Sequence, residues 1–114
     1  MTDLNRKPPV CEIDPGRFTG KTFTRRKCFP DSTDDYSIVI DGLTSGRIMK
    51  KVRHGQRVVW AWFLHGPYYP RGHPHDGEEE TLEAACDAFK KVFWQWHAWA
   101  LKQSSKLTWY GADE

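Results

Sequence analysis

The sequence predicts an α+β fold in which a three-stranded antiparallel sheet packs against one long C-terminal helix. Two observations support this expectation. Short alternating runs of apolar and polar residues, bounded by glycines, follow one another from Tyr36 to His65. A longer stretch, from Leu82 to about Lys102, places its apolar residues at helical spacing. A chain of 114 residues has room for one core, which excludes folds that need two domains.

The first 35 residues are predicted to form an irregular N-terminal arm. Basic, acidic and proline-containing clusters interrupt this segment, and its apolar residues follow neither a strand nor a helix repeat. The chain is therefore divided into an arm (1–35), a sheet-and-helix domain (36–103) and a C-terminal tail (104–114).

Three strands are expected, at residues 36–41, 47–52 and 56–65. Residues 53–55 end in glycine, as a three-residue hairpin loop does when its last residue adopts the left-handed conformation. This loop would pair Val52 with Gln56 and set the register of the hairpin. The expected cross-strand neighbours are then Lys51 with Arg57, Met49 with Val59, Arg47 with Ala61 and Ile48 with Trp60.

This register gives the sheet two unlike faces, because successive strand residues point to opposite sides. The face expected to cover the core carries Ile48, Val52, Val58, Trp60, Trp62 and Leu64. The outer face carries Arg47, Met49, Lys51, Arg57, Val59, Ala61 and Phe63.

Residues 66–80 contain many turn-forming residues and are predicted to be an irregular loop. Thr81 then caps the helix, and Glu83 lies in its first turn, where a carboxylate is favourable. The apolar stripe expected to cover the sheet consists of Leu82, Ala85, Cys86, Phe89, Phe93, Trp96 and Ala100, flanked by Val92 and Trp99.

The outer sheet face is the first candidate site, and nucleic acid, DNA in particular, is the first candidate partner. Although the whole chain has a formal charge of only +2, six cations and two carboxylates lie between residues 36 and 77. The candidate contacts are Arg47, Lys51, Arg53, Arg57 and Phe63, assisted by Arg25, Arg26 and Lys27 of the arm. A purely structural alternative is that these long side chains cover apolar neighbours and deter edge pairing.

A second candidate is a protein-interaction or self-association surface on the polar side of the helix. Trp94 and Leu101 lie two turns apart on that side and need a partner. Either the arm or the tail covers them, or they form, together with Trp109 and Tyr110 of the aromatic tail, a contact with another protein or with a second copy of the chain.

The sequence gives no support for catalysis, a metal site or a cofactor. His65, His73 and His75 lie near Asp76, but no closely spaced cysteine accompanies them, and the common catalytic and phosphate-binding motifs are missing. Three widely spaced cysteines favour reduced thiols, and no apolar run is long enough to cross a membrane. A non-catalytic, cytoplasmic binding protein is therefore expected.

Several of these segments together resemble a group of small uncharacterised alphaproteobacterial proteins. The resemblance rests on residues 35–42, on Gly46-Arg47-Ile48, on Trp60 and Trp62, and on residues 81–85 ahead of Phe89. It implies the order of sheet followed by helix and no activity. The same order occurs in AP2-like and integrase arm-binding domains, in which the sheet contacts DNA, and this is an analogy of fold alone.

Overall fold

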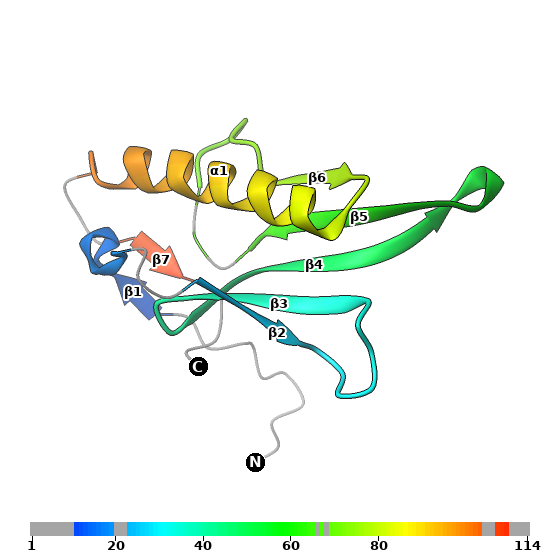
Figure 1. The fold of residues 1–114 in the computed structure, drawn as a ribbon. Helices are drawn as coiled ribbons and strands as arrows, with labels where there is room; N and C mark the ends of the chain where they lie inside the picture. Colours follow the sequence, from blue (N-terminus) through cyan, green and yellow to red (C-terminus); the bar gives the residue numbers. More distant parts are fainter. Residues whose placement is uncertain (1–10, 20–22, 66, 68, 104–106, 110–114) are drawn as a thin grey trace, which may run out of the picture.

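A computed structural model describes residues 11–19, 23–65, 67, 69–103 and 107–109. Along these residues the elements are β1 (Cys11–Ile13), η1 (Pro15–Arg17), β2 (Phe23–Lys27), β3 (Asp35–Ile40), β4 (Leu43–Arg53), η2 (His54–Gln56), β5 (Arg57–Leu64), β6 (Asp76–Glu79), α1 (Leu82–Ala100) and β7 (Leu107–Trp109) (Figure 1).

The main sheet has five antiparallel strands in the order β2-β3-β4-β5-β6, so the prediction of three strands is wrong. The two additional strands, β2 and β6, form the edges of the described sheet. They come from the N-terminal segment and from the loop at 66–80, both of which were expected to be irregular. Each edge strand is short and polar. It forms because it pairs with a neighbouring strand, and it has no alternating apolar pattern by which the sequence could reveal it.

The prediction that the N-terminal arm is irregular is also wrong for β1 and η1. β1 pairs with β7 from the C-terminal tail and forms a second, two-stranded sheet. Ile13, Phe18 and Leu107 are buried in the same hydrophobic core as α1. The ring Nε2 of His97 lies 2.9 Å from the Pro15 carbonyl oxygen. The two ends of the chain therefore contribute to one core.

β4 is longer than the sequence predicts because the preceding turn needs only two residues. Asp41 and Gly42 both have positive φ, 48° and 89°, as in the favoured two-residue hairpin turns. β4 consequently begins at Leu43. Ser45 lies at a β-bulge, and its buried hydroxyl donates to the Leu43 carbonyl oxygen at 3.0 Å.

The predicted register between β4 and β5 is wrong by two residues, while each side chain lies on the predicted side of the sheet. The prediction that Val52 and Val58 cover the core is nevertheless wrong, because both are exposed, and Val59 and Ala61 of the outer face are buried. Gly55 and Gln56 both have positive φ, so residues 54–56 form the turn. A shift of two residues leaves every side chain on its expected face because strand side chains alternate with period two. The observed neighbours are Lys51 with Val59, Met49 with Ala61, Arg47 with Phe63, Ile48 with Trp62 and Arg53 with Arg57.

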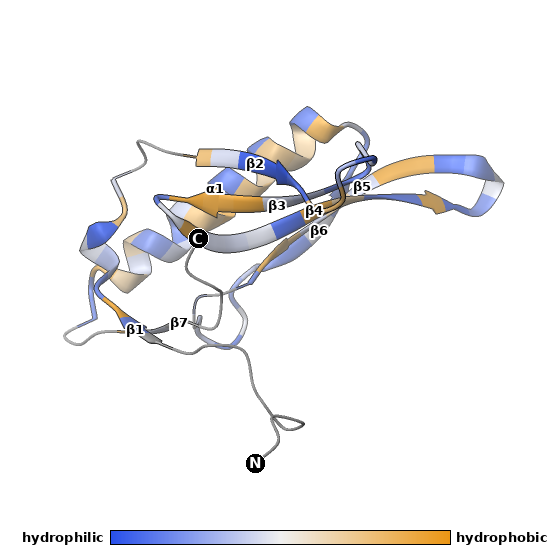
Figure 2. Ribbon diagram, turned by 90° about the horizontal axis from the view of Figure 1, so that it is seen from below, coloured by the Kyte–Doolittle hydropathy of each residue, from blue (hydrophilic) through white to orange (hydrophobic). Residues whose placement is uncertain are grey.

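α1 covers one face of the sheet with the stripe expected from its sequence. Its buried residues are Ala85, Phe89, Val92, Phe93, Trp96 and Ala100. Trp62 is buried against them, and Trp60 packs at the margin of the core. In Figure 2 most of β2 and the tip of the β4–β5 hairpin are hydrophilic, whereas hydrophobic residues are concentrated in the central strands. Both indoles thus contribute to the core, and the opposite face carries Arg47, Lys51, Arg53 and Arg57.

Candidate nucleic-acid interface

Strand pairing places most of the predicted contacts together on the face of the sheet opposite α1. Arg47, Lys51 and Arg53 alternate along β4, and Arg57 and Phe63 lie beside them on β5. Arg26 of β2 stands across from Ser37 on the same face. Arg25 and Lys27, its neighbours in β2, point to the α1 side because the strand alternates.

Arg47 is held in place by a carboxylate of the adjacent strand. Its Nε and Nη2 donate to the two carboxylate oxygens of Asp35 at 2.8 and 2.5 Å, a bidentate arrangement. These hydrogen bonds from Arg47 hold the pKa of Asp35 below its usual value of 3.8, against the opposing effect of burial. Hydrogen bonding to Asp35 also raises the pKa of Arg47. Arg47 therefore has a structural partner within the sheet.

The cations nearer the tip of the hairpin have looser partners. Arg53 pairs with Glu78 of β6, with Nε 3.3 Å from the carboxylate, and both side chains stay more than one-third exposed. Arg57 and Glu80 are 4.0 Å apart and largely exposed. Lys51 lies over the Phe63 ring, with Nζ 5.7 Å from the ring centroid. A phosphate can replace such exposed contacts at little cost, because an exposed ion pair contributes little to stability.

The outer half of the β4–β5 hairpin projects beyond the rest of the sheet (Figure 1). The β3 ladder reaches β4 only as far as Met49, and the β6 ladder begins on β5 at Trp60. Residues 50–59 are therefore a two-stranded ribbon whose strands form a ladder with each other. Among the described residues, the Lys50 N–H also donates to the Asp34 carbonyl oxygen at 2.8 Å, at the base of the ribbon. We call this segment the hairpin ribbon.

The two faces of the hairpin ribbon differ. Lys51, Arg53 and Arg57 lie on the outer face. The other face bears Val52 and Val58, which stand opposite each other and are 62% and 41% exposed. Lys50 is on this second face, with Nζ 3.5 Å from Asp34. Strand alternation places Lys50 on the side that covers the core elsewhere in the sheet, so the sequence does not predict it as a contact. Beyond β3, however, this side of the hairpin ribbon is exposed at Val52 and Val58.

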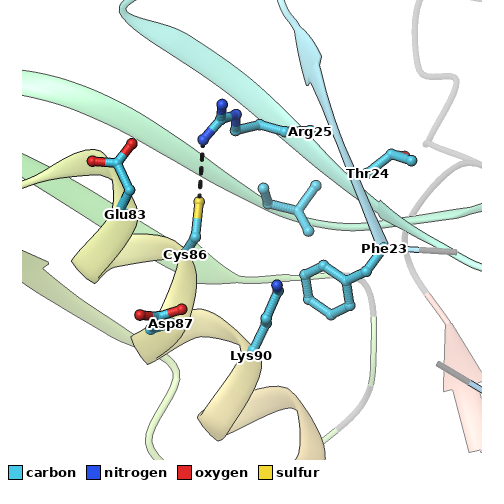
Figure 3. Close-up of a pocket in the computed structure, with 8 residues that line it drawn as sticks. Phe23, Thr24, Arg25, Glu83, Cys86, Asp87 and Lys90 are labelled. Carbon is cyan, nitrogen blue, oxygen red and sulfur yellow. Dashed lines mark hydrogen bonds between the residues drawn. The ribbon is translucent and has the colours of Figure 1, made fainter. Parts of the chain in front are cut away.

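Arg25 lines a groove of about 400 Å³ between β2 and α1 (Figure 3). Its Nη1 donates to the Cys86 sulfur at 3.6 Å, and its guanidinium lies 5.0 Å from the Tyr36 ring centroid. Glu83, Asp87 and Lys90 complete the charged lining. The groove holds equal numbers of cations and carboxylates, so it offers an incoming phosphate no net attraction.

Two of the four residues of the predicted protein-interaction surface, Trp94 and Leu101, have described side chains. The Trp94 ring is half-buried and makes edge contacts with Phe93 and His97, at 5.1 Å between centroids in each case. Leu101 is 53% exposed. The backbone of Trp109 pairs with Cys11 in β7, and Tyr110 lies outside the described residues. The alternative of a protein partner stays a prediction.

The histidine-rich loop stacks on itself. Tyr69 and His75 are parallel at 5.2 Å between ring centroids, and the His75 ring Nε2 is 3.7 Å from Asp76. Across the described residues, no group of three or more His, Cys, Asp or Glu side chains is arranged to hold a metal ion. In the same part of the chain, no helix is long and apolar enough to span a membrane.

Comparisons with protein families, with curated proteins and with solved structures find no match to this chain. The resemblance to small alphaproteobacterial proteins stays a prediction. The charge and the shape of the hairpin ribbon are the features that point to a function.

Proposed function

We propose that the protein binds nucleic acid, duplex DNA in particular, through the hairpin ribbon. The observation that carries the proposal is that residues 42–75 contain six cations and no carboxylate, and four of these cations lie on a projecting ribbon. In the described part of the chain, Asp34, Glu78 and Glu80 of the flanking segments bring carboxylates to the ribbon.

The shape of the ribbon suits a groove of DNA. A two-stranded β-ribbon fits the major groove of B-form DNA, which is about 12 Å wide. In this position Lys50, Lys51, Arg53 and Arg57 contact phosphates on either side, which fixes orientation without reading sequence. The apolar pair Val52 and Val58 is available for contact with thymine methyl groups or sugars.

The salt dependence of binding tests the proposal directly. Four phosphate contacts predict a slope of about 3.6 for the fall of log affinity against log salt, because each contact releases about 0.9 counterion. Affinity for a short fluorescent duplex, measured by anisotropy, should accordingly fall about a hundredfold between about 50 and about 200 mM salt. The same titration with a single-stranded oligonucleotide tests whether the duplex is preferred.

A charge-reversed variant identifies the surface. Lys51→Glu with Arg57→Glu should weaken duplex binding strongly and reduce the slope to about 1.8 or less. The matched control, Lys91→Glu with Lys102→Glu, changes the net charge equally at exposed positions on and just after α1. If both double variants lose the same affinity, only net charge matters and the hairpin ribbon is not the site. Unchanged binding by the Lys51 and Arg57 variant would also contradict the proposal.

A further inference from the structure

The two edges of the described sheet carry opposite charge. β2, at one edge, contains the consecutive cations Arg25, Arg26 and Lys27. β6, at the other edge, contains Asp76, Glu78 and Glu79, and Glu80 follows directly. Each strand pairs with a neighbour on one side only, among the residues that the structure describes.

The backbone groups that face outward can be assigned from the ladders. In antiparallel pairs, hydrogen-bonded and non-hydrogen-bonded positions alternate. The Cys28 N–H donates to the Asp35 carbonyl oxygen at 3.0 Å, so within β2 the backbone groups of Phe23, Arg25 and Lys27 point away from β3. The Leu64 N–H donates to the His75 carbonyl oxygen at 2.6 Å, so in β6 those of Asp76 and Glu78 point away from β5. The outward residues of one edge are thus basic or aromatic, and those of the other are acidic.

This distribution discriminates between the possible edge contacts of two copies. Pairing β2 with β2, or β6 with β6, sets like charges opposite each other, which destabilises a strand pair. Pairing β2 with β6 sets unlike charges opposite each other, and each such pair contributes about 0.2–1 kcal/mol. A second copy of this chain therefore supplies the complementary edge.

We propose that copies of the protein associate head to tail, with β2 of one copy adding antiparallel to β6 of the next. One register matches Lys27 with Asp76 and Arg25 with Glu78. Arg25 and Lys27 lie on the α1 side of their sheet, whereas Asp76 and Glu78 lie on the opposite side of theirs. The helices of successive copies consequently lie on alternate faces of the continuous sheet, where they do not collide.

The association does not depend on the proposed nucleic-acid binding, because it uses the backbone of the sheet edges. Glu78 belongs to the edge contact and also pairs with Arg53 of the hairpin ribbon. A contact between two different surfaces leaves one free edge at each end. Association therefore continues beyond a dimer as the concentration rises. The contact area of two short strands is small, so the affinity is weak and sensitive to salt.

Sedimentation velocity without nucleic acid tests the proposal. The weight-average mass of the wild type should rise above the 13.3 kDa monomer and pass the dimer over about a hundredfold range of protein concentration. It should return to the monomer value at about 1 M salt, where the screening length is about 3 Å. A wild type that stays monomeric at every concentration, or stops at a dimer, contradicts head-to-tail association.

Two charge-swapped variants provide the decisive control. Arg25→Glu with Lys27→Glu makes the outward residues of both edges acidic, and Asp76→Lys with Glu78→Lys makes them basic. Each variant should remain monomeric alone, whereas an equal mixture should associate again, because contacts between the two variants join unlike edges. Lys91→Glu with Lys102→Glu should associate like the wild type. A mixture that stays monomeric although each variant keeps the wild-type circular dichroism spectrum would overturn the pairing of β2 with β6.

Discussion

At the scale of single residues, Gly46 determines how closely α1 approaches the sheet. It lies on the core face of β4, and a Cβ atom there would collide with the Phe89 ring and with the Phe63 carbonyl oxygen. Gly46→Ala should lower the free energy of unfolding by about 2–3 kcal/mol, since a packed backbone cannot move away. Urea denaturation measures this loss.

Gly55 is the matched control for Gly46. Its φ is 75° and nothing lies within 4 Å of an added Cβ, so Gly55→Ala tests backbone strain alone. That strain costs about 1–2 kcal/mol. A loss for Gly46→Ala no greater than the loss for Gly55→Ala would contradict the steric explanation.

The two glycines also show what the sequence reveals at this scale. It marked Gly46 as a turn residue, because glycines bound alternating runs. The turn is completed by Asp41 and Gly42, and Gly46 instead serves the contact with Phe89, a residue 43 positions later. Local patterns cannot identify a contact at such separation. The inward placement of Trp62, in contrast, follows from alternation alone and was predicted correctly.

At the scale of elements, the start of α1 depends on one side chain. The Thr81 hydroxyl oxygen accepts a hydrogen bond from the Ala84 N–H at 3.0 Å. Thr81→Ala should cost about 1 kcal/mol of stability and speed hydrogen exchange at the Ala84 amide, whereas Thr81→Ser retains the acceptor and serves as the control. Equal stability of the Ala and Ser variants would show that the cap contributes nothing.

The success with α1 and the failure with the edge strands have one physical origin. A helix that covers a sheet carries its apolar stripe in its own sequence, and the stripe from Ala85 to Ala100 was predicted. β2 and β6 contribute few apolar side chains and exist because a neighbouring strand offers hydrogen-bonding groups. In the sequence, clusters of charged residues indicate loops, although the same clusters are typical of sheet edges that are protected from pairing with other chains.

At the scale of the whole molecule, a net charge of +2 conceals a segregated distribution. The sequence shows six cations and no carboxylate between residues 42 and 75. It cannot reveal that Asp35 holds Arg47 or that Glu78 pairs with Arg53. Those pairs depend on strand order and register. On the hairpin ribbon such pairs are exposed, as for Arg57 with Glu80, and this exposure follows from the projection of the ribbon beyond β3 and β6.

The pH dependence of global stability provides a test at the same scale. The Nε2 atom of His73 is buried and has no hydrogen-bond partner among the residues that the structure describes. Burial lowers the pKa of His73 below its usual 6.5; the main chain of Val92 opposes this effect, and the charge of His75 adds to it. A lowered histidine pKa means that the unfolded chain binds the proton more readily, so stability is complete above pH 6.5 and falls as the pH drops toward the folded-state pKa. His73→Gln, which cannot titrate, should show a smaller loss of unfolding free energy between about pH 7 and about pH 5 than the wild type.

The Asp35 contribution is separate, since it is present above pH 3.8 and disappears only below that value. Urea denaturation at several pH values measures the unfolding free energy in both pH ranges. If this free energy changed with pH identically above pH 5 in the wild type and in His73→Gln, His73 would be excluded as the titrating group.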